Sequence, residues 1–348
     1  MAAIAPYIAL ALQTTCYAVN DAATPADARA RMVRAIERVR GQIAASKRFV
    51  GPDVKLVVLP EYFLTGFPMG ETIPQWAEKA AIDPDGPEHA AIGRIAKDLD
   101  VWISGNAYER DPHFPGLYFQ TSFLTGPEGH VVLRYRRLIS LFAPSPWDLF
   151  DRYVQIYGRE SIFPVADTPL GRMAAIASEE ILYPEIARAL ALNGAEVFLH
   201  SSSEIAAATD TPKNVAKQAR AIENLAYVVS ANSAGIENIA IPKASTDASS
   251  KVIDYRGLVL AEAGYGESMA AYAEIDVEGL RRYRRRPGMG NILSRLPTAL
   301  FAEAYAATGV QPKGSMQDAS GRPISPDPAF FRQRQQRVID ALVEKGIV

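Results

Sequence analysis

The chain has 348 residues, 48% of them hydrophobic, enough to bury the core of one large α/β domain or two small ones. Its formal charge of −2, from 37 basic and 39 acidic side chains, lacks the basic excess typical of nucleic-acid-binding proteins. The single cysteine, Cys16, excludes an intramolecular disulfide and favours a cytoplasmic location. The apolar N-terminus lacks a basic leader and predicts a strand, not a signal peptide. No apolar run reaches the ~18 residues of a membrane helix.

The first half of the chain alternates between strand-like and helix-like segments. Apolar, β-rich runs predict strands at Ile8–Thr14, Val54–Leu59, Val101–Tyr108, Tyr118–Thr125 and Val131–Tyr135. Helical spacing of apolar residues predicts helices at Pro25–Ser46 and Glu88–Leu99, and Thr24 is a suitable N-cap for the first.

The second half repeats this alternation. Strands are expected at Arg172–Ala177, Val197–His200, Tyr227–Ala231, Val252–Tyr255, Leu258–Ala261 and Ala270–Ile275. Helices are expected at Pro184–Asn193 and Asn214–Asn224. Mixed α and β segments in two similar halves predict stacked sheets between helical layers.

The pattern weakens at Thr298, so we expect a main domain over residues 1–297 and a C-terminal tail over 298–348. Within the tail, Lys313–Pro328 predicts a loop and Phe330–Lys345 a final helix. Whether the tail contacts a second subunit or is a surface extension stays open. The basic run Arg281–Arg286 is expected to be a solvated face or an oligomer contact.

Glu61 follows the strand Val54–Leu59 and is surrounded in sequence by aromatic and apolar residues. Desolvation at such a position would raise the pKa of the carboxyl group and suit it to general-base work. The alternative is a helix-capping or salt-bridged glutamate.

Ser178 ends a second buried strand, ahead of a sharp turn and the helix that starts at Pro184. A side chain at the end of such a strand is held at the mouth of a cleft, where nucleophiles are placed. The alternative is a structural serine that caps the turn.

Three segments together carry a family resemblance. They are Leu59-Pro60-Glu61 with Gly66-Phe67-Pro68, then Tyr135-Arg136-Arg137, and the strand and turn around Ser178. In this order they resemble the nitrilase (carbon–nitrogen hydrolase) superfamily, over roughly Tyr7 to Asp276. The resemblance implies a four-layer α-β-β-α sandwich with a C-terminal extension, a small-molecule substrate, and a homodimer or larger homo-oligomer. It implies a general base at Glu61, oxyanion support at Arg137 and a nucleophile at Ser178.

The chain departs from the family pattern at two of these three positions. The family usually has lysine where Arg137 stands and cysteine where Ser178 stands. Arginine remains a cation but cannot shuttle a proton, and a serine hydroxyl needs a stronger base than a thiol does. Arg137 could instead be a surface residue. Some members use a second glutamate, and here the only acids between 140 and 153 are Asp148 and Asp151.

A stronger base for Ser178 could come from His200, which ends the next strand of a strand–helix–strand unit. Consecutive strands of such a unit usually lie side by side and parallel, so a Ser178–His200 pair oriented by Glu61 or Glu204 is one hypothesis. The alternative is a histidine that bonds to backbone. Glu179 is a further auxiliary candidate, and Asn232 could hold the cleft loop.

Three functions remain open at this stage. The first is hydrolysis of a carbon–nitrogen bond with Ser178 as nucleophile. The second is a non-catalytic binding or regulatory role on the same fold. The third is lyase or hydratase chemistry centred on Glu61 and Arg137. The chain has no glycine-rich phosphate-binding motif and no metal-ligand spacing, so we expect no cofactor and no metal.

Overall fold

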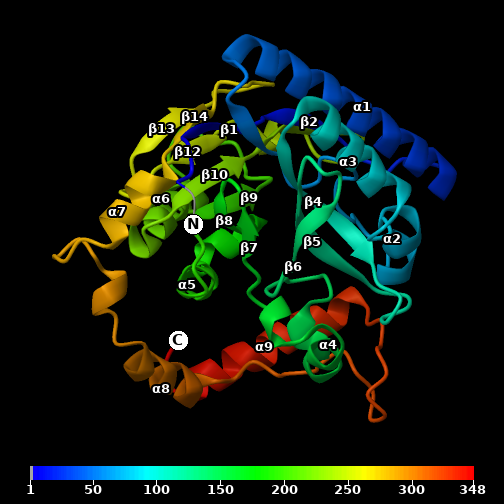
Figure 1. Cartoon of the computed structure of the whole chain (residues 1–348). Helices are drawn as coiled ribbons and strands as arrows, with labels where there is room; N and C mark the ends of the chain where they lie inside the picture. The colour runs from blue at the N-terminus through cyan, green and yellow to red at the C-terminus, as the bar shows by residue number, and fades with distance from the viewer. Residues whose placement is uncertain (1–2) are drawn as a thin grey trace.

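The computed structural model describes residues 3–348 and shows two six-stranded sheets packed face to face between helices (Figure 1). The first sheet, in spatial order, consists of β14 (Tyr272–Ile275), β1 (Tyr7–Ala11), β3 (Val54–Val58), β4 (Trp102–Arg110), β5 (Tyr118–Thr125) and β6 (Val131–Arg136). The second consists of β13 (Val259–Glu262), β12 (Lys251–Ile253), β10 (Tyr227–Ala231), β9 (Val197–Ser201), β8 (Gly171–Ala177) and β7 (Ala166–Thr168). A parallel pair, β2 (Thr14–Tyr17) and β11 (Ser233–Glu237), joins the two halves.

Helices cover the outer face of each sheet, which gives the four-layer α-β-β-α sandwich expected from the sequence. The first sheet is covered by α1 (Pro25–Val50), α2 (Ile73–Lys79) and α3 (Pro87–Leu99), and the second by α5 (Pro184–Leu192) and α6 (Pro212–Asn224). The long α1 begins as predicted, because the Thr24 side chain accepts the Asp27 N–H and a proline follows the cap.

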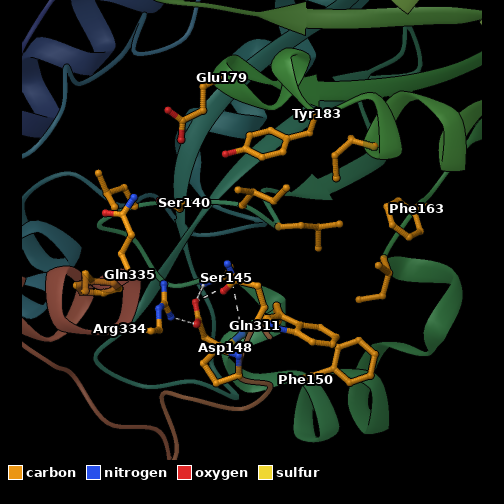
Figure 2. Close-up of a pocket in the computed structure, with 18 of the residues that line it drawn as sticks. Ser140, Ser145, Asp148, Phe150, Phe163, Glu179, Tyr183, Gln311, Arg334 and Gln335 are labelled. Atoms are coloured by element: carbon orange, nitrogen blue, oxygen red, sulfur yellow. Dashed lines mark hydrogen bonds and ion pairs between the residues drawn. The ribbon is translucent and has the colours of Figure 1, made fainter. Parts of the chain in front are cut away.

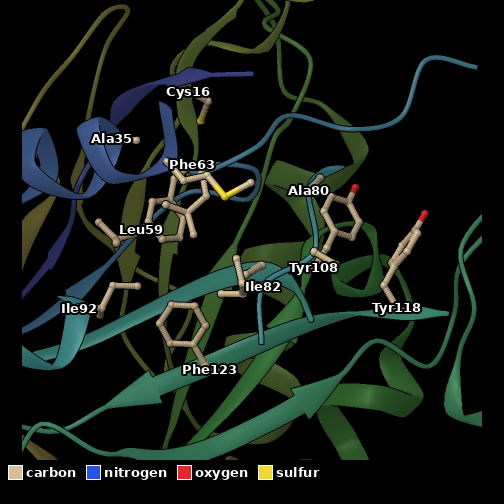
Figure 3. Close-up of a cluster of buried hydrophobic side chains, with 14 of the residues drawn as sticks. Cys16, Ala35, Leu59, Phe63, Ala80, Ile82, Ile92, Tyr108, Tyr118 and Phe123 are labelled. Carbon is tan, nitrogen blue, oxygen red and sulfur yellow. The ribbon is translucent and has the colours of Figure 1, made fainter. Parts of the chain in front are cut away.

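Apolar side chains fill the space between these layers. Figure 3 shows the cluster on the first sheet, where Phe63 and Phe123 lie among aliphatic side chains and Cys16 is fully buried. Burial raises the pKa of the Cys16 thiol well above its usual range, so this sulfur is an inert part of the core. A second cluster lies between the sheets and beneath α5 and α6.

The carboxyl ends of the parallel strands meet at one edge, and this edge positions the candidate site. Strands β8, β9 and β10 run parallel, with Ala177 opposite Ser201. The first sheet is joined there, because the Glu61 N–H donates to Ser202 O (3.2 Å) and Ser201 Oγ donates to Leu59 O (2.8 Å). The ends of β3 and β9 are therefore held together across the two sheets.

The loop after Glu61 requires a glycine. Gly66 has a φ of 70°, and a Cβ on it would lie 2.5 Å from the Cβ of Ala18. This close approach gives a physical reason for the glycine in the first of the resembling segments.

The chain after residue 276 differs in part from expectation. Helix α7 (Val277–Arg284) was not predicted, and the basic run in it is not simply a solvated face. Arg281 pairs with the buried carboxylate of Glu196 (2.7 Å). Arg284 donates to the carbonyls of Leu225 (2.8 Å) and Ala195 (2.6 Å). These arginines satisfy backbone and carboxylate groups at the end of the second sheet.

The tail extends away from the sandwich and returns to it (Figure 1). It contains α8 (Thr298–Thr308), which was not predicted, and α9 (Pro328–Glu344), which was. Helix α9 lies near α4 (Phe150–Tyr157), a short helix that sequence periodicity did not reveal. No helix within residues 3–348 is long and apolar enough to cross a membrane.

Candidate active site

Ser178 lies on a sharp elbow between β8 and a short 3-10 turn, residues 178–182. Its φ of 49° is in the left-handed region, which is costly for a residue with a Cβ and must be held by its surroundings. The residue is 4% exposed. A strained elbow at the carboxyl end of a sheet is a common position for a nucleophile.

Glu180 links this elbow by hydrogen bonds to the end of β6. One carboxylate oxygen accepts the N–H groups of Leu138 (2.8 Å) and Ile139 (2.9 Å), and the other accepts the hydroxyl of Tyr135 (2.7 Å). Burial raises the pKa of Glu180 to about 7, while the charge of Arg137 opposes the shift. The sequence analysis did not single out this residue.

Glu61 lies at the end of β3 and is 1% exposed. Its carboxylate accepts a hydrogen bond from Gln120 Nε2 and lies 3.7 Å from Arg137 Nη1. Gln120 in turn donates to Asn106 Oδ1 (3.1 Å). The glutamate is therefore buried and paired, and its carboxylate is held by β5 and β6. Gln120 was missed, although a glutamine inside an aromatic strand is a signal that could have found it.

Arg137 is buried, which excludes the surface alternative. Its Nε donates to Ile139 O (2.7 Å), its Nη1 to Gln120 Oε1 (2.7 Å), and its Nη2 pairs with the Glu179 carboxylate. Although burial opposes a charge here, Glu61 and Glu179 raise the pKa of Arg137. The guanidinium is a fixed cation between two carboxylates, and it brings Glu179 and Glu61 into one cluster.

His200 lies beside the elbow, as the strand order predicted, but it does not face the Ser178 hydroxyl. Its Nε2 contacts the backbone carbonyl oxygen of Ser178 (2.9 Å) and its Nδ1 the hydroxyl of Ser230 (2.8 Å). Burial lowers the pKa of His200 well below its usual range, so the ring is neutral. The hypothesis of a Ser178–His200 proton relay is therefore wrong, because Nε2 already carries the proton it donates and Nδ1 accepts from Ser230.

Glu204 does not orient His200 either, because its carboxylate is bound elsewhere. It accepts from Lys217 Nζ (2.7 Å) and from the Thr211 hydroxyl. Asn232 holds the backbone of this loop, since its Oδ1 accepts the Glu204 N–H (2.7 Å) and its Nδ2 donates to Ala248 O (2.7 Å). Glu204, Lys217 and Asn232 are buried in and beside α6.

Lys213 is the side chain that reaches the Ser178 hydroxyl. Its Nζ lies 3.4 Å from Ser178 Oγ, and within residues 3–348 no other side chain is hydrogen-bonded to that oxygen. Lys213 was not among the residues predicted from the sequence. A lysine in the first turn of a helix, where the helix dipole disfavours a cation, was the signal available.

A cavity of about 870 Å³ opens beside the elbow (Figure 2). Glu179 and Tyr183 line one side, and Arg334 and Gln335 of α9 line the opposite side. The two acids considered as a second functional carboxylate do not reach the Glu61 cluster. Asp148 instead bonds Arg334 and Ser315 (2.8 Å to its hydroxyl), and Asp151 pairs with Lys313 (2.9 Å), so both hold the tail.

No metal-binding cluster is built into this site. Across residues 3–348, His, Cys, Asp and Glu side chains do not gather in groups of three or more that could hold an ion. The polar groups of the cleft are instead paired with one another, as buried polar groups usually are.

Comparison with known proteins identifies the family. The carbon-nitrogen hydrolase family model matches residues 12–285. A formamidase from Pseudomonas syringae pv. syringae is 26% identical over 256 residues, which cover 73% of this chain and 69% of that protein. The fold is similar to that of Saccharomyces cerevisiae Nit3, a member of branch 10 of the nitrilase superfamily (TM-score 0.64, 20% identity, 80% of this chain and 93% of that chain).

A solved amidase from Nesterenkonia sp. shows the same fold, with a TM-score of 0.60 and 17% identity over 87% of this chain and 97% of that chain. The matched region contains all three segments that carry the resemblance and ends before the tail. The chain therefore belongs to the carbon–nitrogen hydrolase family.

Proposed function

We propose that this protein hydrolyses the carbon–nitrogen bond of a small amide, with Ser178 as the nucleophile. The observation that carries the proposal is the buried, strained elbow that presents Ser178 beside the Glu61–Arg137–Glu179 cluster. Family membership supports the reaction class, and the relatives named formamidase support a small, uncharged amide as substrate.

Four residues of the site have roles in this proposal. Ser178 Oγ attacks the carbonyl carbon, and the amine or ammonia leaves to give an acyl-enzyme ester. Arg137, with the backbone N–H of Glu179, stabilises the oxyanion because a fixed cation in a dry site interacts strongly with developing negative charge. A water molecule then cleaves the ester. It gives one proton to Glu61 and the other to Ser178 Oγ, so the product leaves as a carboxylate.

The cavity between the elbow and α9 is the proposed path by which substrate reaches Ser178. Its lining combines apolar side chains such as Phe163 and Leu141 with the polar ends of Glu179, Tyr183 and Gln335. A volume of about 870 Å³ is larger than formamide requires, so amides with an apolar substituent also fit.

The experiment that tests this function measures ammonia or amine release from a panel of amides, N-carbamoyl compounds and nitriles. We expect release by the unaltered chain, a loss on the order of 10⁴-fold in Ser178→Ala, and retained or higher activity in Ser178→Cys, because a thiol is the more reactive nucleophile. Ser320→Ala, at an exposed serine of the tail, is the matched control.

Two outcomes would contradict the proposal. Release that survives in Ser178→Ala but is lost in Glu61→Gln would indicate non-covalent chemistry centred on Glu61. Release by no variant, including Ser178→Cys, would indicate a binding or regulatory protein.

We further propose that the protein is cytoplasmic and forms a homodimer or larger homo-oligomer through its tail. The tail helix α8 supports this, since none of its residues is buried and Leu300, Phe301 and Tyr305 are exposed on it. Light scattering coupled to size exclusion tests this proposal, with a chain that ends at Pro297 as the comparison. A monomeric full-length chain would contradict it.

A further inference from the structure

We propose that Lys213 is the catalytic base for Ser178, so that the two residues form a serine–lysine pair in place of the family's usual activation of its nucleophile. This inference rests on the proposed function and adds to it the group that takes the hydroxyl proton. It is carried by the position of Lys213 Nζ, 3.4 Å from Ser178 Oγ.

The surrounding elements hold both members of the pair. Ser178 is fixed by the elbow, whose backbone carbonyl accepts from His200. Lys213 is fixed in the first turn of α6, which starts from the Thr211 cap and is anchored to the loop by the Thr211–Glu204 bond. The lysine side chain is half-buried, so it can reach the hydroxyl from the cleft wall and still exchange protons with solvent.

The other candidate bases are bonded to groups other than the Ser178 hydroxyl. His200 uses both ring nitrogens, as described above. Glu61 is bonded to Gln120 and paired with Arg137. Arg137 never gives up its proton under ordinary conditions, so it cannot replace the family's lysine in proton transfer.

A second lysine lies close to Lys213 on α6. Lys217 lies one helical turn further along, fully buried and paired with Glu204. Burial lowers the pKa of Lys217 to about 8, Glu204 opposes that shift, and the nearby charge of Lys213 adds to it. The neutral His200 lies near both lysines of α6, and Lys251 lies near Lys217.

The proton transfer balances without any further reactant. The neutral Lys213 amine accepts the proton of Ser178 as Oγ forms its bond to the amide carbon. The resulting ammonium gives that proton to the substrate nitrogen as the carbon–nitrogen bond breaks, and the neutral amine product departs. Lys213 is then neutral again beside the acyl-enzyme. General-base assistance of this kind contributes roughly 100-fold to 10,000-fold to a rate.

The test uses a fluorophosphonate probe, which reports activation of the serine independently of amide hydrolysis. Ser178 Oγ attacks phosphorus, fluoride leaves, and Lys213 takes the hydroxyl proton. Labelling of the full-length chain is followed by mass spectrometry, with Ser178→Ala as the blank. The variants are Lys213→Met, which removes the amine, and Lys213→Arg, which keeps the charge but cannot accept a proton. Lys243→Met, at an exposed lysine, is the matched control.

We expect labelling at Ser178 to slow by about 100-fold or more in both Lys213→Met and Lys213→Arg and to stay unchanged in Lys243→Met. Lys213→Cys treated with 2-bromoethylamine regains a side-chain amine and should regain labelling. The treatment is selective because Cys16 is fully buried.

Three results would overturn the pair. They are labelling of Lys213→Met at the unaltered rate, labelling of Lys213→Arg at the unaltered rate, and no labelling of the unaltered chain at Ser178. The proposed function fails separately, if no amide in the panel is hydrolysed. Rapid, Lys213-dependent labelling without amide hydrolysis would keep the pair and reject the substrate class.

Discussion

Two buried ion pairs lie on either side of Ser178. Glu61 lies beside Arg137 on one side of the cleft, and Glu204 is bonded to Lys217 on the other. A buried pair adds little net stability because desolvation offsets the attraction, but removing one partner leaves an uncompensated charge. The side chains that support the site are therefore more sensitive to single than to paired substitution.

Lys217→Met is expected to destabilise the fold by about 3–5 kcal/mol, because it leaves the Glu204 carboxylate buried without its cation. The double variant Lys217→Met/Glu204→Gln should recover much of this loss, since the unpaired charge is gone. Urea denaturation of the two single variants and the double variant measures the coupling. Losses that simply add would contradict a buried, interdependent pair.

The sequence predicted the positions of residues where a motif lies at the end of a strand. It did not predict hydrogen-bond partners that come from distant elements. The order of the segments placed Glu61, Arg137 and Ser178, and the structure brings the first two together in one charged cluster beside the elbow. The adjacency of His200 followed from parallel strand order, yet its ring orientation did not, because Ser230 and the elbow carbonyl decide it. Lys213 contacts Ser178 across 35 residues of sequence, and no local pattern contains that contact.

At the scale of elements, the elbow depends on a bridge between two sheets. Glu180 of the elbow bonds the backbone at the end of β6, the strand that also delivers Arg137. The positions of Ser178 and Arg137 are thus fixed relative to each other by one buried carboxyl group. This bridge titrates, because burial raises the pKa of Glu180 to about 7 from an ordinary value of 4.5.

The pH dependence of stability should report this bridge. Between pH 4.5 and about 7 the folded protein binds the Glu180 proton more tightly than the unfolded chain does. The stability from this group is therefore fully present below pH 4.5 and is lost as pH rises through 7. Since one pKa unit corresponds to ~1.4 kcal/mol, the loss is worth about 3 kcal/mol.

Glu180→Gln should remove this slope, because its amide can still accept the two N–H groups and donate to Tyr135. Free energies of unfolding measured from pH 4 to 8 check the expectation, with Glu128→Gln at an exposed turn as the control. Identical slopes in the unaltered chain and Glu180→Gln would refute it.

Sequence patterning identified the elements that build the two sheets and missed most of the short ones. Parallel strands such as β9 are buried on both faces and appear as continuous apolar runs, which are easy to recognise. Helix α8 has no buried residue, so the amphipathic pattern that reveals a packed helix is absent from it. Helix α6 was expected from Asn214 and begins at Pro212, a difference that left Lys213 outside the predicted helix.

At the scale of the whole molecule, the tail forms one wall of the cavity beside the elbow. Arg334 of α9 pairs with Asp148 beside it (Figure 2) and donates to the Ser315 hydroxyl (2.9 Å), and Phe331 is buried against the body of the fold. Asp148 is 2% exposed and also caps the turn that leads into α4, where it accepts the Ser145 N–H (3.0 Å). One carboxylate therefore joins the position of the tail to the shape of the cavity.

Arg334→Met should loosen the contact of α9 with the body of the fold, because it leaves the Asp148 carboxylate buried beside a hydroxyl and without its cation. We expect a loss of about 3 kcal/mol in the stability of the tail and a faster cleavage within residues 309–327 by trypsin, while the sandwich stays folded. Because α9 lines the cavity and does not contact Ser178, KM for the best amide should rise with kcat little changed. Arg332→Met, an exposed arginine on the same helix, is the matched control. A fall in kcat with unchanged KM would instead place the tail's influence on the chemical step, through the loop that connects Arg137 to Asp148.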